Sequence, residues 1–200
     1  MSEVGNAVTY SVLVVCTANI CRSPMAQAFL QRSLDAAGVG ASVSSAGTSG
    51  LVEWGMPAAP EAVEVMASMG LDLTGHSSRA LTAQQLLSAD LVVGMAREHL
   101  RDAAVMAPEA LPRLMTLKEL VRRAGMAGAP GVGEELGVWV QRLTADRPLG
   151  ELLGDSPVDD IDDPFGLPLV EFRRTAAELA DLSDRIAASL ALIGRPAPQA

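Results

Sequence analysis

Two patterns of hydrophobic residues alternate along the chain. Mainly apolar stretches, which are typical of buried strands, cover residues 8–15 and 89–95, and two shorter stretches, 41–45 and 113–117, are also predicted to be strands. Apolar residues at helical spacing predict helices over 24–37, 61–69, 83–87 and from residue 168 onward. This alternation predicts a parallel sheet with helices on both faces.

The first predicted strand leads directly into a cysteine, a short loop and a helix. Cys16 follows the apolar run, and the helix is expected to begin with Ser23 as its N-cap and Pro24 at its first helical position. Ligands of parallel sheets bind at the carboxyl ends of the strands. Cys16 therefore lies where a ligand is expected.

Length and composition indicate one soluble globular domain. The chain has 200 residues, of which 49% are hydrophobic and 20% charged, and this is enough for a full core. No apolar run approaches the roughly 20 residues of a membrane span, and the first ten residues lack the features of a signal peptide. We therefore expect a cytoplasmic protein with no membrane partner. The net charge of −9 argues against nucleic acid as a partner.

The remaining segments add little chemistry. Residues 125–157 are punctuated by Gly and Pro and predict at most one helix, so we interpret them as an insertion or extended region of a single domain over residues 1–193. Residues 194–200 are expected to form a flexible tail. No His or Cys cluster has zinc spacing, and Cys16 and Cys21 lie too close in sequence to staple the fold. We expect no metal and no other cofactor.

The segment from Cys16 to Ser23 has the features of a phosphate-binding loop that carries a nucleophile. A loop that enters a helix N-terminus turns backbone N–H groups inward, and the helix dipole adds partial positive charge. Arg22 supplies a planar guanidinium that can bind two phosphoryl oxygens. The same field stabilises a thiolate at Cys16, to which the Ser23 hydroxyl can donate a hydrogen bond. These groups predict phosphoryl transfer through a cysteinyl-phosphate, although a cysteine at a strand end is more often a small buried hydrophobe.

Several short motifs together resemble one enzyme family. They are Cys16–Pro24, Ser45–Thr48, His76 with Arg79, Asp90–Met95 and Asp163–Gly166. In this order, over roughly residues 8–192, they resemble the low-molecular-weight protein tyrosine phosphatases. The resemblance implies a four-stranded parallel sheet of flavodoxin-like topology and a metal-free hydrolysis of phosphotyrosine in protein substrates.

The resemblance also implies roles for individual residues. Cys16 would be the nucleophile, Arg22 the phosphate clamp, and Asp163 the general acid that protonates the leaving phenolate and then the base for the attacking water. Phosphate and substrate would be bound by Thr17, Ala18, Asn19, Ile20, Cys21, Arg22, Ser23 and Phe165. Asn19, which tolerates left-handed backbone, would hold the loop through a network with Ser23, Ser45 and His76.

The acidic loop before Pro164 raises the question of which carboxyl is the acid. Its five aspartates are Asp155, Asp159, Asp160, Asp162 and Asp163. A charge run is usually a solvated face, so we expect four of them to be exposed to solvent. Asp163 differs because the following proline restricts its backbone to an extended shape. Phe165 then offers one aromatic wall, and Trp54 is a candidate for another.

Three alternatives accompany this interpretation. Related arginine phosphatases carry Thr at the position of Ile20, whose apolar bulk suits an aromatic ring better. Related arsenate reductases need further cysteines downstream, and this chain has none after Cys21. A phosphotyrosine-binding module without activity would need no acid such as Asp163. The sequence therefore favours the phosphatase, with the arginine phosphatase and the regulatory binder as the main alternatives.

Overall fold

Four parallel strands form the centre of the molecule. The computed structural model describes residues 10–50, 53–152, 154–191 and 193. Its sheet contains β1 (Tyr10–Cys16), β2 (Ala41–Gly47), β3 (Leu91–Gly94) and β4 (Leu114–Thr116), in the order β2-β1-β3-β4. This order confirms the predicted parallel sheet of flavodoxin-like topology. Residues 8 and 9 of the first predicted strand and the predicted tail, 194–200, lie outside the described residues.

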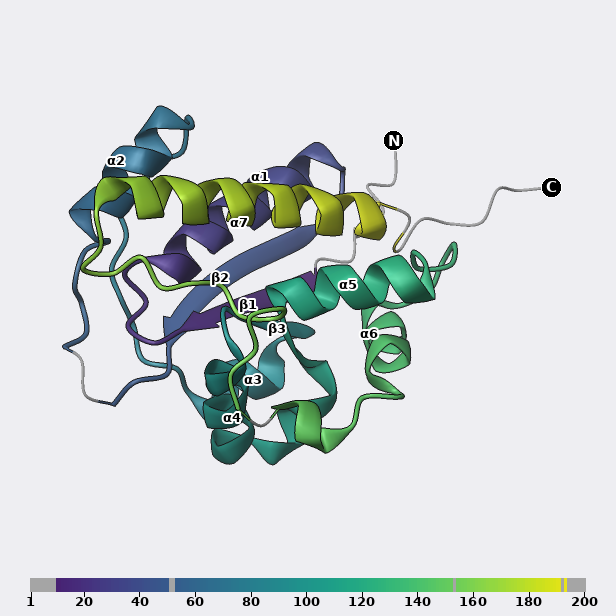
Figure 1. Cartoon of the computed structure of the whole chain (residues 1–200). Coiled ribbons are helices and arrows are strands. Elements are labelled where there is room, and N and C mark those ends of the chain that lie inside the picture. The colour runs from purple at the N-terminus through teal and green to yellow at the C-terminus, as the bar shows by residue number, and fades with distance from the viewer. Residues whose placement is uncertain (1–9, 51–52, 153, 192, 194–200) are drawn as a thin grey trace, which may run out of the picture.

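Helices cover both faces of the sheet (Figure 1). One face carries α1 (Arg22–Ala36), α2 (Pro60–Ser68), α5 (Leu117–Ala127), α6 (Leu136–Thr144) and α7 (Leu169–Leu190), whose apolar side chains share one core cluster. The other face carries α3 (Ala83–Ser88), α4 (Arg97–Met106) and the 3-10 helix η1 (Pro108–Arg113). Among these described helices, none combines the length and the apolar character of a membrane span.

The side chains of β1 supply both cores. Val12 and Val14 join the cluster under α1 and α7, whereas Leu13 and Val15 join the cluster under α3 and α4. Successive side chains of a strand point to opposite faces, so a strand covered on both sides needs apolar residues at every position. This requirement explains the unbroken apolar run that ends at Cys16.

Helix α1 begins earlier than the sequence predicts. It starts at Arg22 with Cys21 as N-cap, and the Cys21 side chain makes no capping hydrogen bond. The prediction of Ser23 as N-cap is therefore wrong. The Ser23 hydroxyl lies inside the first helical turn and faces the loop, where it contacts Cys16 and Asn19.

The hydrophobic pattern missed α4 and α5. The buried face of α4 consists of His99, Leu100 and Ala103, so a histidine interrupts the apolar stripe that would have revealed the helix. Helix α5 follows β4 without a loop, and the apolar run of the strand continues into the helix at Leu117. Where an apolar run crosses the boundary between two elements, the pattern alone does not locate that boundary.

The extended region, residues 125–157, packs against the rest of the fold. It contains α6, which is the one helix that the sequence allowed there, and a short 3-10 helix, η2 (Leu149–Leu152). Trp139 of α6 is fully buried and donates its indole N–H to the Gly128 carbonyl at 3.2 Å. Arg147 donates to the carbonyl of Leu114 in β4 at 2.6 Å. The region therefore covers the edge strand, which would otherwise present an unpaired carbonyl.

Candidate active site

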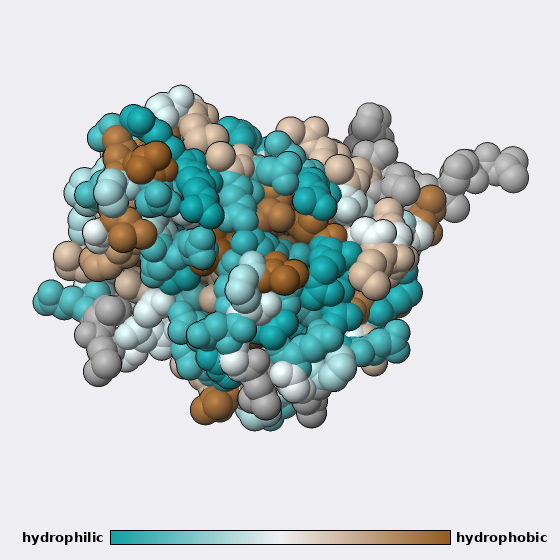
Figure 2. Space-filling view, in the orientation of Figure 1, coloured by the Kyte–Doolittle hydropathy of each residue, from teal (hydrophilic) through white to brown (hydrophobic). Residues whose placement is uncertain are grey.

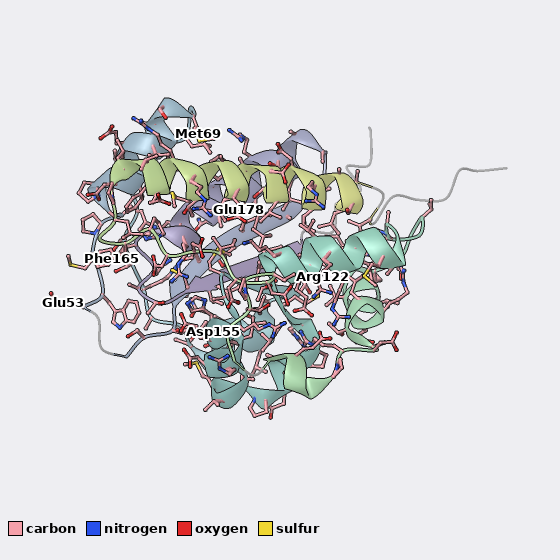
Figure 3. The ribbon with its side chains drawn as sticks, in the orientation of Figure 1. Glu53, Met69, Arg122, Asp155, Phe165 and Glu178 are labelled. Atoms are coloured by element: carbon pink, nitrogen blue, oxygen red, sulfur yellow. The ribbon has the colours of Figure 1, made fainter. Side chains whose placement is uncertain are left out.

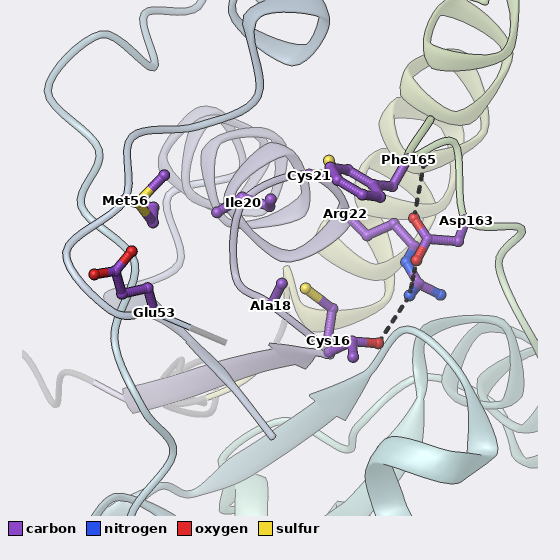
Figure 4. A pocket seen from close by; sticks show the side chains of 10 residues that line it. Cys16, Ala18, Ile20, Cys21, Arg22, Glu53, Met56, Asp163 and Phe165 are labelled. Carbon is purple, nitrogen blue, oxygen red and sulfur yellow. Dashed lines mark hydrogen bonds and ion pairs between the residues drawn. The ribbon is translucent and has the colours of Figure 1, made fainter. Parts of the chain in front are cut away.

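The loop between β1 and α1 forms the floor of a cavity of about 410 Å³ at the carboxyl end of the sheet (Figure 4). The lining residues are Cys16, Thr17, Ala18, Ile20, Cys21, Arg22, Glu53, Met56, Asp163 and Phe165. Most of the predicted site residues thus meet in one place, although 141 positions separate Arg22 from Asp163. In Figure 3, Phe165 and Glu53 lie on the same side of the molecule.

Asn19 fixes the shape of this loop. It is fully buried and has a φ of 56°, and it is the one non-glycine residue in the left-handed region among those described. Its amide nitrogen donates to the hydroxyls of Ser23 and Ser45, both at 2.9 Å, and its amide oxygen accepts from the Arg79 N–H at 3.0 Å. The left-handed backbone costs about 1–2 kcal/mol for a residue with a Cβ, and these hydrogen bonds offset that cost.

His76 supports the same loop from outside. Its Nε2 lies 2.6 Å from the Asn19 carbonyl oxygen, and because a carbonyl can only accept, Nε2 carries the hydrogen. Burial lowers the pKa of His76, and the nearby Arg79 lowers it further, although the bond to Asn19 acts in the opposite direction. The predicted hydrogen-bonding network of Asn19, Ser23, Ser45 and His76 is therefore present.

The network has a defined direction that ends at the thiol. Ser45 accepts from Asn19, so its own hydroxyl hydrogen is free to donate to Gln27 Oε1, 2.7 Å away. Ser23 likewise accepts from Asn19, and its hydrogen can point to Cys16 Sγ, 3.0 Å away. A donor aimed at sulfur stabilises a thiolate. No role for Gln27 follows from the sequence pattern, because its partner Ser45 lies 18 positions away on β2.

Arg22 reaches across the cavity to the acidic loop. Its guanidinium donates to Asp163 Oδ2 at 2.6 Å, to the Ile161 carbonyl at 3.2 Å and to Thr17 Oγ1 at 3.2 Å. The Arg22 side chain is buried, whereas that of Asp163 is exposed on one side. Asp163 also accepts from the Phe165 N–H at 3.1 Å. Figure 4 shows the carboxylate above Arg22, with Cys16 on the opposite side of the guanidinium.

A second histidine, His99, supports Arg22, the predicted phosphate clamp, through Thr17. The sequence analysis assigned it no role. His99 of α4 is fully buried; its Nδ1 accepts the Ala96 N–H at 2.9 Å, so Nε2 carries the hydrogen and donates to Thr17 Oγ1 at 3.0 Å. Burial, together with the charge of Arg22, lowers the pKa of His99 to about 3. His99 is therefore a neutral donor, and through Thr17 it supports Arg22.

Comparison with known proteins places this arrangement in a family. The family model described as low molecular weight phosphotyrosine protein phosphatase matches residues 11–129. The chain belongs to this family. The match ends near the start of the extended region, so the acidic loop joins the site through the structure rather than through the family match.

Individual relatives support the same assignment. The low molecular weight protein-tyrosine-phosphatase Etp of Escherichia coli K12 is 42% identical over 105 residues, which are 52% of this chain and 67% of Etp. The probable low molecular weight protein-tyrosine-phosphatase EpsP of Ralstonia solanacearum is 42% identical over 110 residues, which are 55% of this chain and 72% of EpsP.

Solved structures extend the similarity over most of the fold. A low molecular weight protein tyrosine phosphatase from T. tengcongensis covers 88% of this chain and 97% of its own length, with a TM-score of 0.65 and 32% identity. The YwlE arginine phosphatase from Geobacillus stearothermophilus covers 90% of this chain and 92% of its own length, with a TM-score of 0.67 and 30% identity. Since phosphatases with different names share this fold, the fold alone does not select the phosphorylated residue.

The acidic loop corrects the sequence analysis. Asp155 and Asp162 are exposed as expected, but Asp159 is buried and pairs with Arg97 and Arg122. Asp160 is half-buried and accepts backbone N–H groups. The prediction that four of the five aspartates are solvated is therefore wrong for these two. The arginine partners of Asp159 and one of the two N–H partners of Asp160 come from α4 and α5, which the sequence pattern did not reveal.

The aromatic walls also differ from expectation. Phe165 lines the cavity as predicted, but Trp54 does not: its ring lies so close to Gly47 that a Cβ there would approach it to 2.8 Å. Met56 lines the cavity instead. Cys21 is buried in the wall, and burial, together with the charge of Asp163, raises the pKa of its thiol to about 12. Cys21 is therefore a neutral thiol at physiological pH.

Proposed function

We propose that this chain hydrolyses phosphotyrosine in proteins through a cysteinyl-phosphate intermediate. The observation that carries the proposal is the meeting of three groups at one cavity: the Cys16 thiol, the Arg22 guanidinium and the Asp163 carboxyl. These are a nucleophile, an anion clamp and a proton carrier, which together satisfy the requirements of phosphoryl transfer.

In the first step, the Cys16 thiolate attacks phosphorus and the bond to the tyrosyl oxygen breaks. Backbone N–H groups of the loop, the N-terminus of α1 and Arg22 bind the phosphoryl oxygens, while Ser23 stabilises the thiolate before attack. Asp163 gives its proton to the departing phenolate. The products of this step are tyrosine, the cysteinyl-phosphate and the Asp163 carboxylate.

In the second step, the intermediate is hydrolysed. The Asp163 carboxylate takes a proton from water, whose oxygen attacks phosphorus, and the sulfur–phosphorus bond breaks. Inorganic phosphate leaves, and Cys16 returns as a thiolate that Ser23 again stabilises. The Asp163 side chain has the partial exposure that access to water requires.

The shape of the cavity supports an aromatic substrate. Ala18, Ile20, Met56 and Phe165 give it apolar walls, against which a phenyl ring can pack. These apolar walls offer no hydrogen-bond acceptor to the guanidinium of phosphoarginine, although the carboxylates of Glu53 and Asp163 in the same lining would accept from it. Phosphotyrosine-bearing proteins are therefore the proposed partners.

Turnover of matched peptides tests this proposal. We expect the protein to release phosphate from phosphotyrosine peptides faster than from phosphoserine or phosphoarginine peptides, and the Cys16→Ser variant to release none. A preference for phosphoarginine would assign the arginine-phosphatase activity. Tight binding of phosphotyrosine without turnover by the unmodified protein would identify a regulatory binding module.

A further inference from the structure

One buried carboxylate outside the cavity holds the acidic loop to the body of the fold. Asp159 is 2% exposed, and its Oδ2 lies 2.6 Å from Arg97 Nη2 at the start of α4. Its Oδ1 lies 3.1 Å from Arg122 Nη2 in α5. Asp159 is thus bonded to elements on both faces of the sheet. Figure 2 shows hydrophilic and apolar side chains together on the visible face around α5 and α7. Ile161 of the acidic loop is buried in the apolar cluster that α5 and α7 share, so apolar burial holds this loop as well as charge.

The buried cluster of Asp159, Arg97 and Arg122 fixes the position of the acidic loop more than it adds to the stability of the fold. Burial alone would raise the pKa of Asp159, but the hydrogen bonds and charges of Arg97 and Arg122 outweigh it and lower that pKa. The Nε of Arg122 is buried without a hydrogen-bond partner among the described residues. Ion pairs taken out of water add little net stability, and an unpaired donor reduces it further. What such a cluster supplies is one defined position for the loop.

The two residues after Asp159, which lead toward the cavity, are also held by hydrogen bonds to the body of the fold. Asp160 accepts the Arg97 N–H at 2.8 Å, and its carbonyl accepts from Lys118 at 2.7 Å. The Ile161 N–H donates to the Met95 carbonyl at 2.8 Å. Residues 159–161 are therefore each bonded to α4, to α5 or to Met95, the residue after β3, and Asp163 follows only two residues later.

Placement matters for a proton donor because the transfer needs hydrogen-bond contact with the leaving oxygen. A displacement of about 1 Å can slow such a step by about a hundredfold. The loop that carries Cys16 has its own support in the hydrogen bonds of Asn19, Ser45 and His76. It meets the acidic loop through Arg22, which donates to the Ile161 carbonyl and to Asp163.

We propose that Asp159 is a positioning residue for the general acid: its ion pairs with Arg97 and Arg122 set the place of the Asp163 carboxyl. The inference rests on the proposed phosphatase function. It assigns Asp159 to protonation of the leaving group, and not to attack by Cys16.

The test compares aryl phosphates whose phenols differ in pKa, using Asp159→Asn and the matched control Asp162→Asn. Asp162 is in the same loop, but its side chain is 83% exposed and its ion-pair partner, Arg174, is also exposed. For Asp159→Asn we expect kcat/KM to fall about tenfold or more with phenols of high pKa, which need protonation, and to approach the unmodified value with phenols of low pKa. Asp162→Asn should retain the unmodified values throughout the series.

A second variant protects the test against misfolding. Arg122→Gln removes one of the two partners of Asp159 and leaves the Arg97 ion pair, so we expect the same dependence on the leaving group with a smaller amplitude. If Asp159→Asn does not fold, the dependence of kcat/KM on the leaving group in Arg122→Gln tests the inference by itself. Equal loss for all leaving groups, or no loss, in the folded variants would overturn the inference. Failure of the unmodified protein to hydrolyse any aryl phosphate would instead contradict the proposed function.

Discussion

Arg22 and Asp163 bind each other across the cavity, with 2.6 Å between the guanidinium nitrogen Nη2 and Oδ2. The proposed phosphate clamp and the proposed acid are therefore partners in the protein without substrate. A phosphate dianion that enters the cavity competes with Asp163 for the same guanidinium. Substrate binding would thus release the Asp163 carboxyl from its ion pair and leave it free to carry the proton that catalysis requires.

The first prediction concerns Asp163→Asn. Because the variant cannot donate a proton, kcat/KM should fall by about a hundredfold or more for phenols of high pKa, and the loss should shrink as the leaving group becomes a weaker base. The change also removes a negative charge that competes for Arg22, so inorganic phosphate should inhibit the variant more strongly. Steady-state kinetics with phosphate as inhibitor measure both effects.

The matched control for that experiment is the neighbouring aspartate. Asp162→Asn should leave both the rates and the phosphate inhibition unchanged, because its side chain lies in solvent. If Asp162→Asn lost its activity while Asp163→Asn kept it, the general acid would be Asp162 and not Asp163.

The second prediction separates the two contributions of Asn19. Asn19→Ala and Asn19→Gly both remove the amide that bonds Ser23 and Ser45, but only Gly adopts a φ of 56° freely. We expect the Ala variant to be less stable than the Gly variant by about 1 kcal/mol, measured by urea unfolding. Both should lose activity, since the Ser23 hydroxyl would no longer be oriented. Equal stability of the two variants would show that the loop relaxes to another backbone conformation.

The third prediction concerns substrate choice. Ile20→Thr introduces a hydroxyl into the apolar wall and should raise the ratio of phosphoarginine to phosphotyrosine turnover. Paired assays on peptides of one sequence give this ratio, and Ile20→Val, which stays apolar, is the control. An unchanged ratio in the Thr variant would transfer the selectivity to Met56 and Phe165, the other apolar walls of the cavity.

The fourth prediction follows from His99. Its folded-state pKa of about 3 lies below its ordinary value of 6.5, so unfolding takes up a proton at mildly acidic pH. The stability that neutral His99 contributes is complete above pH 6.5 and is lost as the pH falls toward about 3. Between pH 7 and pH 5, this residue should lower the free energy of unfolding by about 2 kcal/mol.

Urea unfolding at several pH values measures that loss. His76, the other histidine, has a lowered pKa as well and acts in the same direction. His99→Gln keeps a donor and an acceptor but does not titrate, so its stability should depend less on pH than that of the unmodified protein. Identical pH dependence in the two proteins would contradict the burial of a neutral His99.

The parallel sheet and the position of the proposed nucleophilic loop could both be predicted from the sequence. Strands buried on both faces need continuous apolar runs, and a loop that binds phosphate concentrates its residues within a few positions of the strand and the helix. Cys16, Arg22 and Ser23 are therefore local in sequence. Asp163 could be proposed as the general acid because the proline after it and the resemblance to the family motif mark one aspartate among five.

The arrangement of the supporting groups depends on tertiary contacts. The sequence pattern predicts a solvated Asp159, because its partners Arg97 and Arg122 are 62 and 37 positions away. His99 is 82 positions from Thr17. Because His99 interrupts the apolar face of α4, the hydrophobic pattern did not predict that helix. Whether a polar side chain is exposed or buried depends on which partners packing brings to it. That pairing is long-range, and the local sequence pattern does not contain it.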